Sequence, residues 1–198
     1  MLDSYARDIV QPAIEKGAKI LRSAGLSANS ITWIAMLIGV GSGVVFYLGF
    51  PIAAVVILWI SGYLDSVDGT LARMTKPSKW GNILDITFDR VVEGALIIAI
   101  LLVHPDAYLP IVLNLAAILV NITAFLVTGN VITNSGAKGF HYNPGILERT
   151  EAFIFFSLMI LFPNAIWELA WLFLVLLLFT TIRHLRDVYV WLQKNNVD

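Results

Sequence analysis

The sequence contains no cysteine and few charged side chains. Without cysteine, disulfide bridges, thiolate nucleophiles and thiolate metal sites are excluded. Only 14% of the 198 residues are charged, whereas an ordinary soluble domain carries about 25%. With 58% hydrophobic residues and a mean hydropathy of +0.80, the chain is predicted to be an integral membrane protein. It has no basic surface large enough for nucleic acid, so we expect no nucleic-acid partner.

Long apolar stretches divide the chain into predicted membrane spans. Residues 23–64 contain no charged side chain, which is enough for two helices of the roughly 20 residues that a span requires. The turn Gly49-Phe50-Pro51 separates them. The predicted spans are residues 31–48, 52–65 with a helical continuation to 73, 83–103, 109–132, 144–163 and 165–192. We therefore expect an all-α fold in a single domain, 1–198, with a helix at 1–28 and a bundle of six transmembrane helices at 29–198.

All 13 Lys and Arg residues fall on one side of this arrangement. The positive-inside rule makes that side cytoplasmic, so a multi-pass protein of the cell membrane with both termini in the cytoplasm is predicted. Residues 1–22 place apolar side chains at helical spacing among acids and bases. This pattern predicts an amphipathic helix on the membrane surface. A helix that packs on the end of the bundle explains the pattern equally well.

Four aspartates gather near the predicted cytoplasmic edge of the bundle. Asp65 and Asp68 are three residues apart on the second span, and Asp85 and Asp89 are four apart on the third. Each pair therefore shares a helix face. Since a short loop joins the two spans, we expect all four carboxylates to converge.

This carboxylate cluster needs compensating charge. Acids at membrane depth are costly, and these four have only two nearby arginines, Arg73 and Arg90. Oxygen ligands without His or Cys favour hard cations such as Mg²⁺, Mn²⁺ or Ca²⁺, and four carboxylates can hold two ions. Salt bridges that fix helix packing are the structural alternative, but they do not explain the excess of acids.

The pattern around these aspartates is D-x2-D-G-x2-A-R followed by G-x3-D-x3-D. It resembles the signature of the CDP-alcohol phosphatidyltransferase family. The fixed positions are Asp65, Asp68, Gly69, Ala72, Arg73, Gly81, Asp85 and Asp89. Seven residues separate the arginine from the second glycine, whereas the commonly quoted form has eight. A weaker similarity is N-x-I-T at Asn29 to Thr32, where Ala28 replaces the expected proline; Asn29 or Ser30 could instead cap the first span.

The resemblance implies an enzyme of phospholipid biosynthesis. Such an enzyme transfers a phosphatidyl group from CDP-diacylglycerol, or an ether-lipid analogue, to the hydroxyl of a small polar alcohol and releases CMP. The resemblance implies Mg²⁺ or Mn²⁺ as cofactor, in two ions, and a homodimer among membrane lipids. The implied metal ligands are Asp65, Asp68, Asp85 and Asp89. Asp89 is also the implied general base. The implied contacts to the CDP moiety are Asp65, Asp68, Gly69, Ala72, Arg73, Gly81 and Thr32.

Basic residues near the later spans are candidates for binding the acceptor. They are Lys138, Arg149, Arg183 and Arg186. They suit an acceptor that bears a phosphate, such as glycerol 3-phosphate or inositol phosphate, with Arg149 the best single candidate. Serine and free inositol are the alternatives, because cytoplasmic arginines also serve topology and lipid headgroups. The roles of Glu93 and of the loop at 138–143 stay open.

Two rival functions fit the buried acids less well. A divalent-cation transporter would place its site at the membrane midplane, often between inverted repeats. Here the acids lie near one surface, and the sequence shows no internal repeat. The second rival is a non-catalytic scaffold that keeps a metal site for structure alone.

Overall fold

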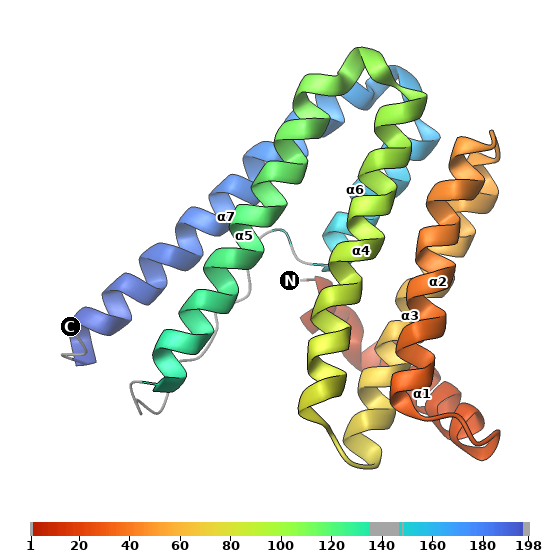
Figure 1. The fold of residues 1–198 in the computed structure, drawn as a ribbon, viewed down its shortest axis with the longest axis vertical. Coiled ribbons are helices and arrows are strands. Elements are labelled where there is room, and N and C mark those ends of the chain that lie inside the picture. Colours follow the sequence, from red (N-terminus) through yellow and green to blue (C-terminus); the bar gives the residue numbers. More distant parts are fainter. Residues whose placement is uncertain (1, 135–146, 148, 196–198) are drawn as a thin grey trace.

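The chain forms a bundle of long helices in the computed structural model, which describes residues 2–134, 147 and 149–195. Within these residues there is no strand (Figure 1). The helices are α1 (Leu2–Ser23), α2 (Ala28–Tyr47), α3 (Pro51–Met74), α4 (Lys79–Val103), α5 (Tyr108–Asn134), α6 (Arg149–Leu161) and α7 (Ile166–Asn195). Short 3-10 turns at Pro105–Ala107 and Pro163–Ala165 precede α5 and α7. The predicted all-α class is confirmed, and each predicted span corresponds to one helix of α2–α7.

Local sequence explains where the helices begin. Ser27 accepts a hydrogen bond from the Ser30 backbone N–H and caps α2, so the residue that caps this helix is neither Asn29 nor Ser30. Ser78 caps α4 in the same way. Pro51 stands in the first turn of α3, where its missing N–H leaves no helical bond unmade. Gly49 adopts φ +90°, a conformation that favours glycine and makes the tight turn between α2 and α3.

Helix α2 holds the carboxylate-bearing helices together, since it packs against both α3 and α4. A Cβ atom on Gly39 would lie 2.7 Å from Ser61 Oγ and from Val92 Cγ2, so the glycine permits this close approach. Helices α5 and α7 lie side by side, and α6 packs against α3, α4 and α7 (Figure 1). The main core runs between these helices and contains Leu58, Leu96, Ile100, Phe156 and Phe173.

Helix α1 packs on one end of the bundle. Ala18 is fully buried in a small cluster with Ile31, Val67 and Leu71, and the Tyr63 hydroxyl donates to the Ala13 carbonyl at 3.0 Å. The structure therefore supports the packed alternative for this segment. Contact with the membrane surface remains a prediction.

Four segments are long and apolar enough to cross a membrane: Ala28–Tyr47, Pro51–Met74, Pro105–Ile132 and Pro163–Lys194. Together with the exposed apolar side chains along these helices, they make the chain a multi-pass membrane protein. Helix α4 carries more charged residues than a typical membrane span, and α6, with 13 residues, is shorter than the roughly 20 that a span requires. The count of six spans therefore stays a prediction.

Candidate functional site

Three of the four predicted carboxylates come together between α3 and α4. Oxygen atoms of Asp65, Asp68 and Asp85 lie within 4.8 Å of one another. This convergence follows from the i, i+3 spacing on α3 and from the packing of both helices against α2. Asp68 is buried, with 4% of its surface exposed. We call Asp65, Asp68 and Asp85 the carboxylate triad.

Asp89 lies one turn beyond the triad and is paired with Arg149. Its Oδ1 atom lies 2.7 Å from Arg149 Nη2. Arg149 Nη1 also donates to Asp65 Oδ2, so the first residue of α6 ties α3 to α4. The predicted four-carboxylate cluster therefore consists of three converging aspartates and a fourth linked to them through an arginine. A metal-binding role for Asp89 stays a prediction.

Neither of the arginines expected near the acids neutralises the triad. Arg73 donates from Nη2 to Thr70 Oγ1 at 2.9 Å. Arg90 lies 2.7 Å from Glu93 Oε1 and 3.9 Å from Asp89 Oδ2. Among the described residues, the cation that contacts the triad is Arg149, which sequence reasoning had assigned to the acceptor alone.

The triad suits a hard divalent cation. All its donor atoms are carboxylate oxygens, which Mg²⁺ and Mn²⁺ prefer. Asp68 Oδ2 is buried and has no hydrogen-bond partner among the described residues. A buried carboxylate oxygen without a partner is costly, and coordination to a cation would satisfy it.

A cavity of about 220 Å³ opens on one side of the triad, and we call it the motif cavity. Its lining includes Thr32, Asp68, Gly69, Ala72, Arg73 and Gly81. The structure thus brings together six of the seven residues predicted to contact the CDP moiety, while Asp65 lies outside the lining. Asn29, Lys76 and Asn82 also line this cavity. Sequence reasoning did not assign Lys76 and Asn82 to the site, although Lys76 stands between the two motif halves and Asn82 directly follows Gly81 in the second half.

The two glycines of the motif, Gly69 and Gly81, serve different structural purposes. A Cβ atom on Gly69 would meet only Arg73 Nη1, at 3.5 Å, so the space over this backbone is open to a ligand. A Cβ atom on Gly81 would lie 2.9 Å from Asn29 Oδ1 and 3.0 Å from Ser78 Oγ. Gly81 therefore lets the start of α2 approach the start of α4.

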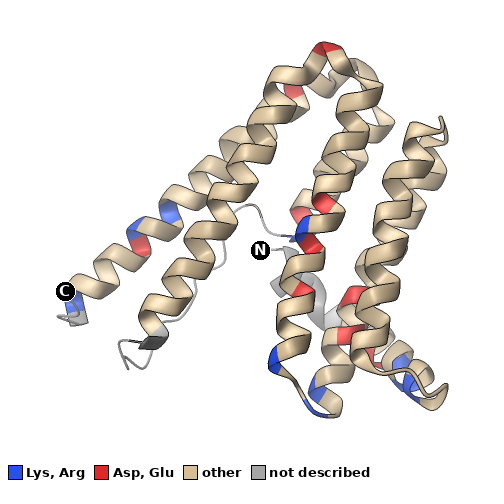
Figure 2. Cartoon of the chain, in the orientation of Figure 1, with Lys and Arg blue, Asp and Glu red and all other residues tan. Residues whose placement is uncertain are grey.

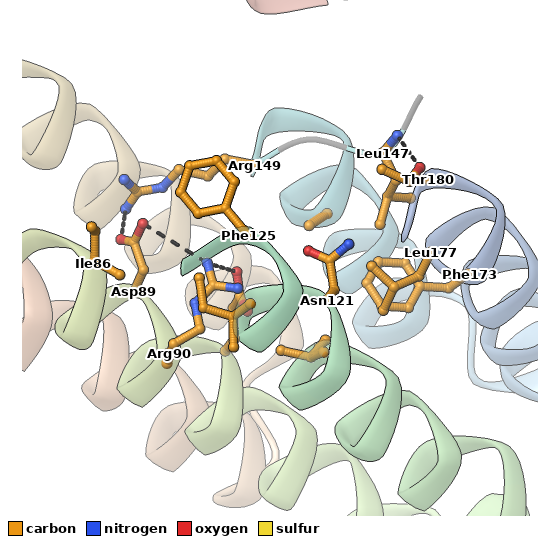
Figure 3. A pocket seen from close by; sticks show the side chains of 14 residues that line it. Ile86, Asp89, Arg90, Asn121, Phe125, Leu147, Arg149, Phe173, Leu177 and Thr180 are labelled. Carbon is orange, nitrogen blue, oxygen red and sulfur yellow. Dashed lines mark hydrogen bonds and ion pairs between the residues drawn. The ribbon is translucent and has the colours of Figure 1, made fainter. Parts of the chain in front are cut away.

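A second cavity, of about 370 Å³, lies among α4, α5, α6 and α7, and we call it the central cavity (Figure 3). Its polar lining consists of Asp89, Arg90, Glu93, Asn121, Arg149 and Thr180. Figure 3 shows Arg149 and Arg90 reaching Asp89 from different sides. Asp85 lines the motif cavity and Asp89 lines the central cavity, so one turn of α4 presents a carboxylate to each.

The predicted acceptor residues divide into three groups. Arg149 lines the central cavity. Arg183 and Arg186 are exposed on α7 and do not belong to its described lining. Lys138 and the loop at 138–143 lie outside the described residues. Glu93, whose role the sequence left open, both pairs with Arg90 and lines the central cavity.

Comparison with known proteins gives a consistent result. A family model described as CDP-alcohol phosphatidyltransferase matches residues 26–183. A phosphatidylinositol phosphate synthase from Corynebacterium glutamicum is 33% identical over 159 residues, covering 78% of this chain and 71% of the relative. An archaetidylinositol phosphate synthase from Pyrococcus horikoshii is 39% identical over 103 residues. That match spans 52% of this chain and about half, 54%, of the archaeal protein.

Solved structures share the fold. The phosphatidylinositol phosphate synthase of Mycobacterium tuberculosis, in complex with manganese and citrate, has a TM-score of 0.71 and 21% identity. The match covers 89% of this chain and 88% of that one. The same protein with CDP-DAG bound has a TM-score of 0.70 and 22% identity, covering 89% and 93%.

Proposed function

Because the chain belongs to the CDP-alcohol phosphatidyltransferase family, we propose that it transfers the phosphatidyl group of a CDP-linked lipid to a hydroxyl of inositol phosphate and releases CMP. The observation that carries this proposal is the placement of Asp85 and Asp89. One turn of α4 presents one carboxylate to the motif cavity and the other to the central cavity. A donor in the first cavity and an acceptor in the second would meet at these side chains.

The acceptor is proposed from the cavity and the relatives together. Relatives from a bacterium and an archaeon are named as inositol phosphate-type synthases. In the central cavity, Arg149 offers a guanidinium for a phosphate, and Glu93, Asn121 and Thr180 add polar groups. Of the two phosphate-bearing acceptors that the sequence left open, this favours inositol phosphate over glycerol 3-phosphate. Serine and free inositol lack the phosphate that Arg149 would bind.

The triad would hold Mg²⁺ or Mn²⁺, with Asp89 contributing to a second ion. Such a metal would supply positive charge where the pyrophosphate of the donor accumulates negative charge during transfer. Asp65, Asp68 and Asp85 would hold it in a defined position, because they come from two helices that α2 packs against. All three side chains offer carboxylate oxygens, and none offers a thiolate or an imidazole, which agrees with a hard cation.

The residues of the chain divide the remaining work. Gly69 leaves its backbone open to the CDP moiety, and Arg73 and Lys76 place cations at the rim of the motif cavity. Asp89 accepts the proton from the attacking hydroxyl of the acceptor. The hydroxyl oxygen forms a bond to the lipid-side phosphorus, and the bond from this phosphorus to the CMP oxygen breaks. CMP leaves as the dianion that the basic rim binds.

An acceptor panel tests the proposal. Purified protein with CDP-diacylglycerol and Mn²⁺ is given inositol phosphate, glycerol 3-phosphate, inositol or serine in turn, and CMP release is measured. Inositol phosphate is expected to support release, and a chelator to abolish it. Release with glycerol 3-phosphate alone would overturn the acceptor assignment. Metal uptake into proteoliposomes without any donor lipid, together with no CMP release, would instead favour a cation transporter.

The membrane arrangement is also a proposal. The Lys and Arg residues of the described part lie away from the end that carries the α4–α5 and α6–α7 connections (Figure 2), which supports six spans with both termini and the active site in the cytoplasm. Exposed apolar residues of α5, among them Leu119, Val120 and Val127, offer a face to a second copy. Cross-linking of the detergent-solubilised protein would test the homodimer.

A further inference from the structure

Glu93 and Arg90 form a charged pair that the transfer chemistry described above does not use. They lie three residues apart on α4, and Arg90 Nη2 is 2.7 Å from Glu93 Oε1. Only 5% of the Glu93 surface is exposed. The Arg90 side chain is partly exposed, but a buried carboxylate in a membrane protein is costly and is commonly functional, so the position of Glu93 asks for an explanation beyond packing.

The pair is only partly satisfied within the protein. Glu93 Oε2 and Arg90 Nε are buried and have no hydrogen-bond partner among the described residues. Leaving a buried polar atom unpaired is costly, and more so when the group is charged. A ligand with hydrogen-bond donors would recover this energy at Glu93 Oε2.

The unpaired oxygen belongs to the lining of the central cavity. Glu93 and Arg90 line it together with Asp89 and Arg149, and the volume of about 370 Å³ is in the range of small-molecule sites. The hydroxyl of Thr180, which also lines the cavity, already has its partners. Its Oγ1 atom donates to the Leu176 carbonyl and accepts from the Leu147 N–H. In the described lining, Glu93 is therefore the residue with a buried carboxylate oxygen that has no hydrogen-bond partner.

We propose that Glu93 determines specificity for a polyhydroxylated acceptor. Its free carboxylate oxygen accepts a hydrogen bond from a hydroxyl of the acceptor other than the one that attacks, and Arg90 is a positioning residue that holds the carboxylate in place. An acceptor without that hydroxyl leaves a buried charge unpaired. Sites built to bind a hydroxyl reject analogues that lack it far more strongly than apolar pockets reject extra groups. This inference rests on the proposed function and names the substrate feature that the same site recognises.

The test substitutes Glu93→Gln and varies the acceptor. Glutamine keeps an oxygen for Arg90 but replaces the free carboxylate oxygen with an amide NH₂, which donates. We expect the KM for inositol phosphate to rise about tenfold or more, with a smaller change in kcat. Wild-type protein should discriminate against one deoxy-inositol phosphate, and the variant should discriminate against it less. Glu168→Gln, the same substitution at an exposed position of α7, is the matched control and should leave both values unchanged.

The possible outcomes separate this inference from the proposed function. No acceptor-dependent CMP release from wild-type protein with any inositol phosphate overturns the proposed function. Normal wild-type activity with an unchanged KM and unchanged deoxy discrimination in Glu93→Gln overturns the role of Glu93 alone. If the variant fails to fold, binding of the deoxy series to wild-type protein by calorimetry decides instead. Equal affinity for every analogue would then contradict the inference, and a loss confined to one hydroxyl would support it.

Discussion

At the scale of single residues, Arg149 stands between two competing roles: pairing with the aspartates of the metal site and binding the phosphate of the acceptor. It contacts Asp65 and Asp89, both of which are proposed to bind metal, and it lines the cavity proposed for the acceptor phosphate. Its guanidinium supplies positive charge beside the triad. Under the proposed function, a divalent cation at the triad would replace that charge and leave Arg149 available to the acceptor.

The substitution Arg149→Gln is predicted to separate these two roles. Without the competing guanidinium, Mn²⁺ should bind about tenfold more tightly, which corresponds to ~1.4 kcal/mol, while the KM for inositol phosphate should rise. Electron paramagnetic resonance of free Mn²⁺ measures the first effect, and CMP release measures the second. Arg183→Gln removes an exposed cation of α7 and is the control. Weaker Mn²⁺ binding in Arg149→Gln would show that the arginine does not compete with metal.

The aspartates of the site could be predicted from the sequence, but their partner could not. Spacing alone places Asp65 with Asp68 and Asp85 with Asp89 on shared helix faces. Arg149 is 84 residues from Asp65 along the chain, and its position depends on how α6 packs against α3 and α4. No local pattern encodes that packing, so the sequence pointed to Arg73 and Arg90 as the nearby cations.

At the scale of helices, α2 sets the spacing of the site. It contacts both α3 and α4, and small residues let it do so. Gly39 faces Ser61 and Val92, and the Ser61 hydroxyl donates to the Ala35 carbonyl at 2.7 Å. Gly43 lies against the Ala95 backbone, where a Cβ atom would be 3.1 Å from the carbonyl oxygen. The separation of the triad carboxylates therefore depends on residues that bind no ligand.

Gly39→Ala is predicted to destabilise the bundle and to disturb the metal site from a distance. The added Cβ overlaps the Val92 side chain, and overpacking of this kind costs typically 1–3 kcal/mol. Thermal unfolding in detergent should shift to lower temperature, and Mn²⁺ should bind more weakly. Gly41→Ala, where nothing lies within 4 Å of the new atom, should preserve both. Equal stability of the two variants would contradict this account of α2.

Helix positions could be predicted closely because apolar runs, proline and glycine mark them. The predicted helical continuation of the second span to 73 agrees with the end of α3 at Met74. The cap of α2 could not be chosen among Ser27, Asn29 and Ser30 by residue type, since all three are good caps. Its identity depends on which residue has extended backbone, and this is Ser27, with φ −84° and ψ 158°.

At the scale of the whole molecule, the two ends of the bundle differ in their basic residues. Asp106 lies in the α4–α5 connection and Glu168 in the first turn of α7. Figure 2 shows acidic but no basic residues at this end, and the α4–α5 and α6–α7 connections contain no Lys or Arg. Lys76 and Lys79 lie at the opposite end, around the α3–α4 loop. This asymmetry agrees with the orientation proposed from the positive-inside rule.

Single cysteines are predicted to report this orientation without background, because the chain has no cysteine of its own. In intact cells, a membrane-impermeant maleimide should label Asp106→Cys and leave Lys76→Cys unlabelled until the membrane is opened. Both positions are exposed, so access depends on the side of the membrane. Labelling of Lys76→Cys in intact cells would contradict a cytoplasmic active site.

The most direct test of the central claim is the identity of the lipid product. Purified protein, CDP-diacylglycerol, inositol phosphate and Mn²⁺ are incubated, and the extracted lipid is analysed by mass spectrometry while CMP is quantified. The account predicts phosphatidylinositol phosphate in equal amount to CMP, with both lost in Asp89→Asn although that variant still folds. CMP release without this lipid, or full product formation by Asp89→Asn, would contradict it.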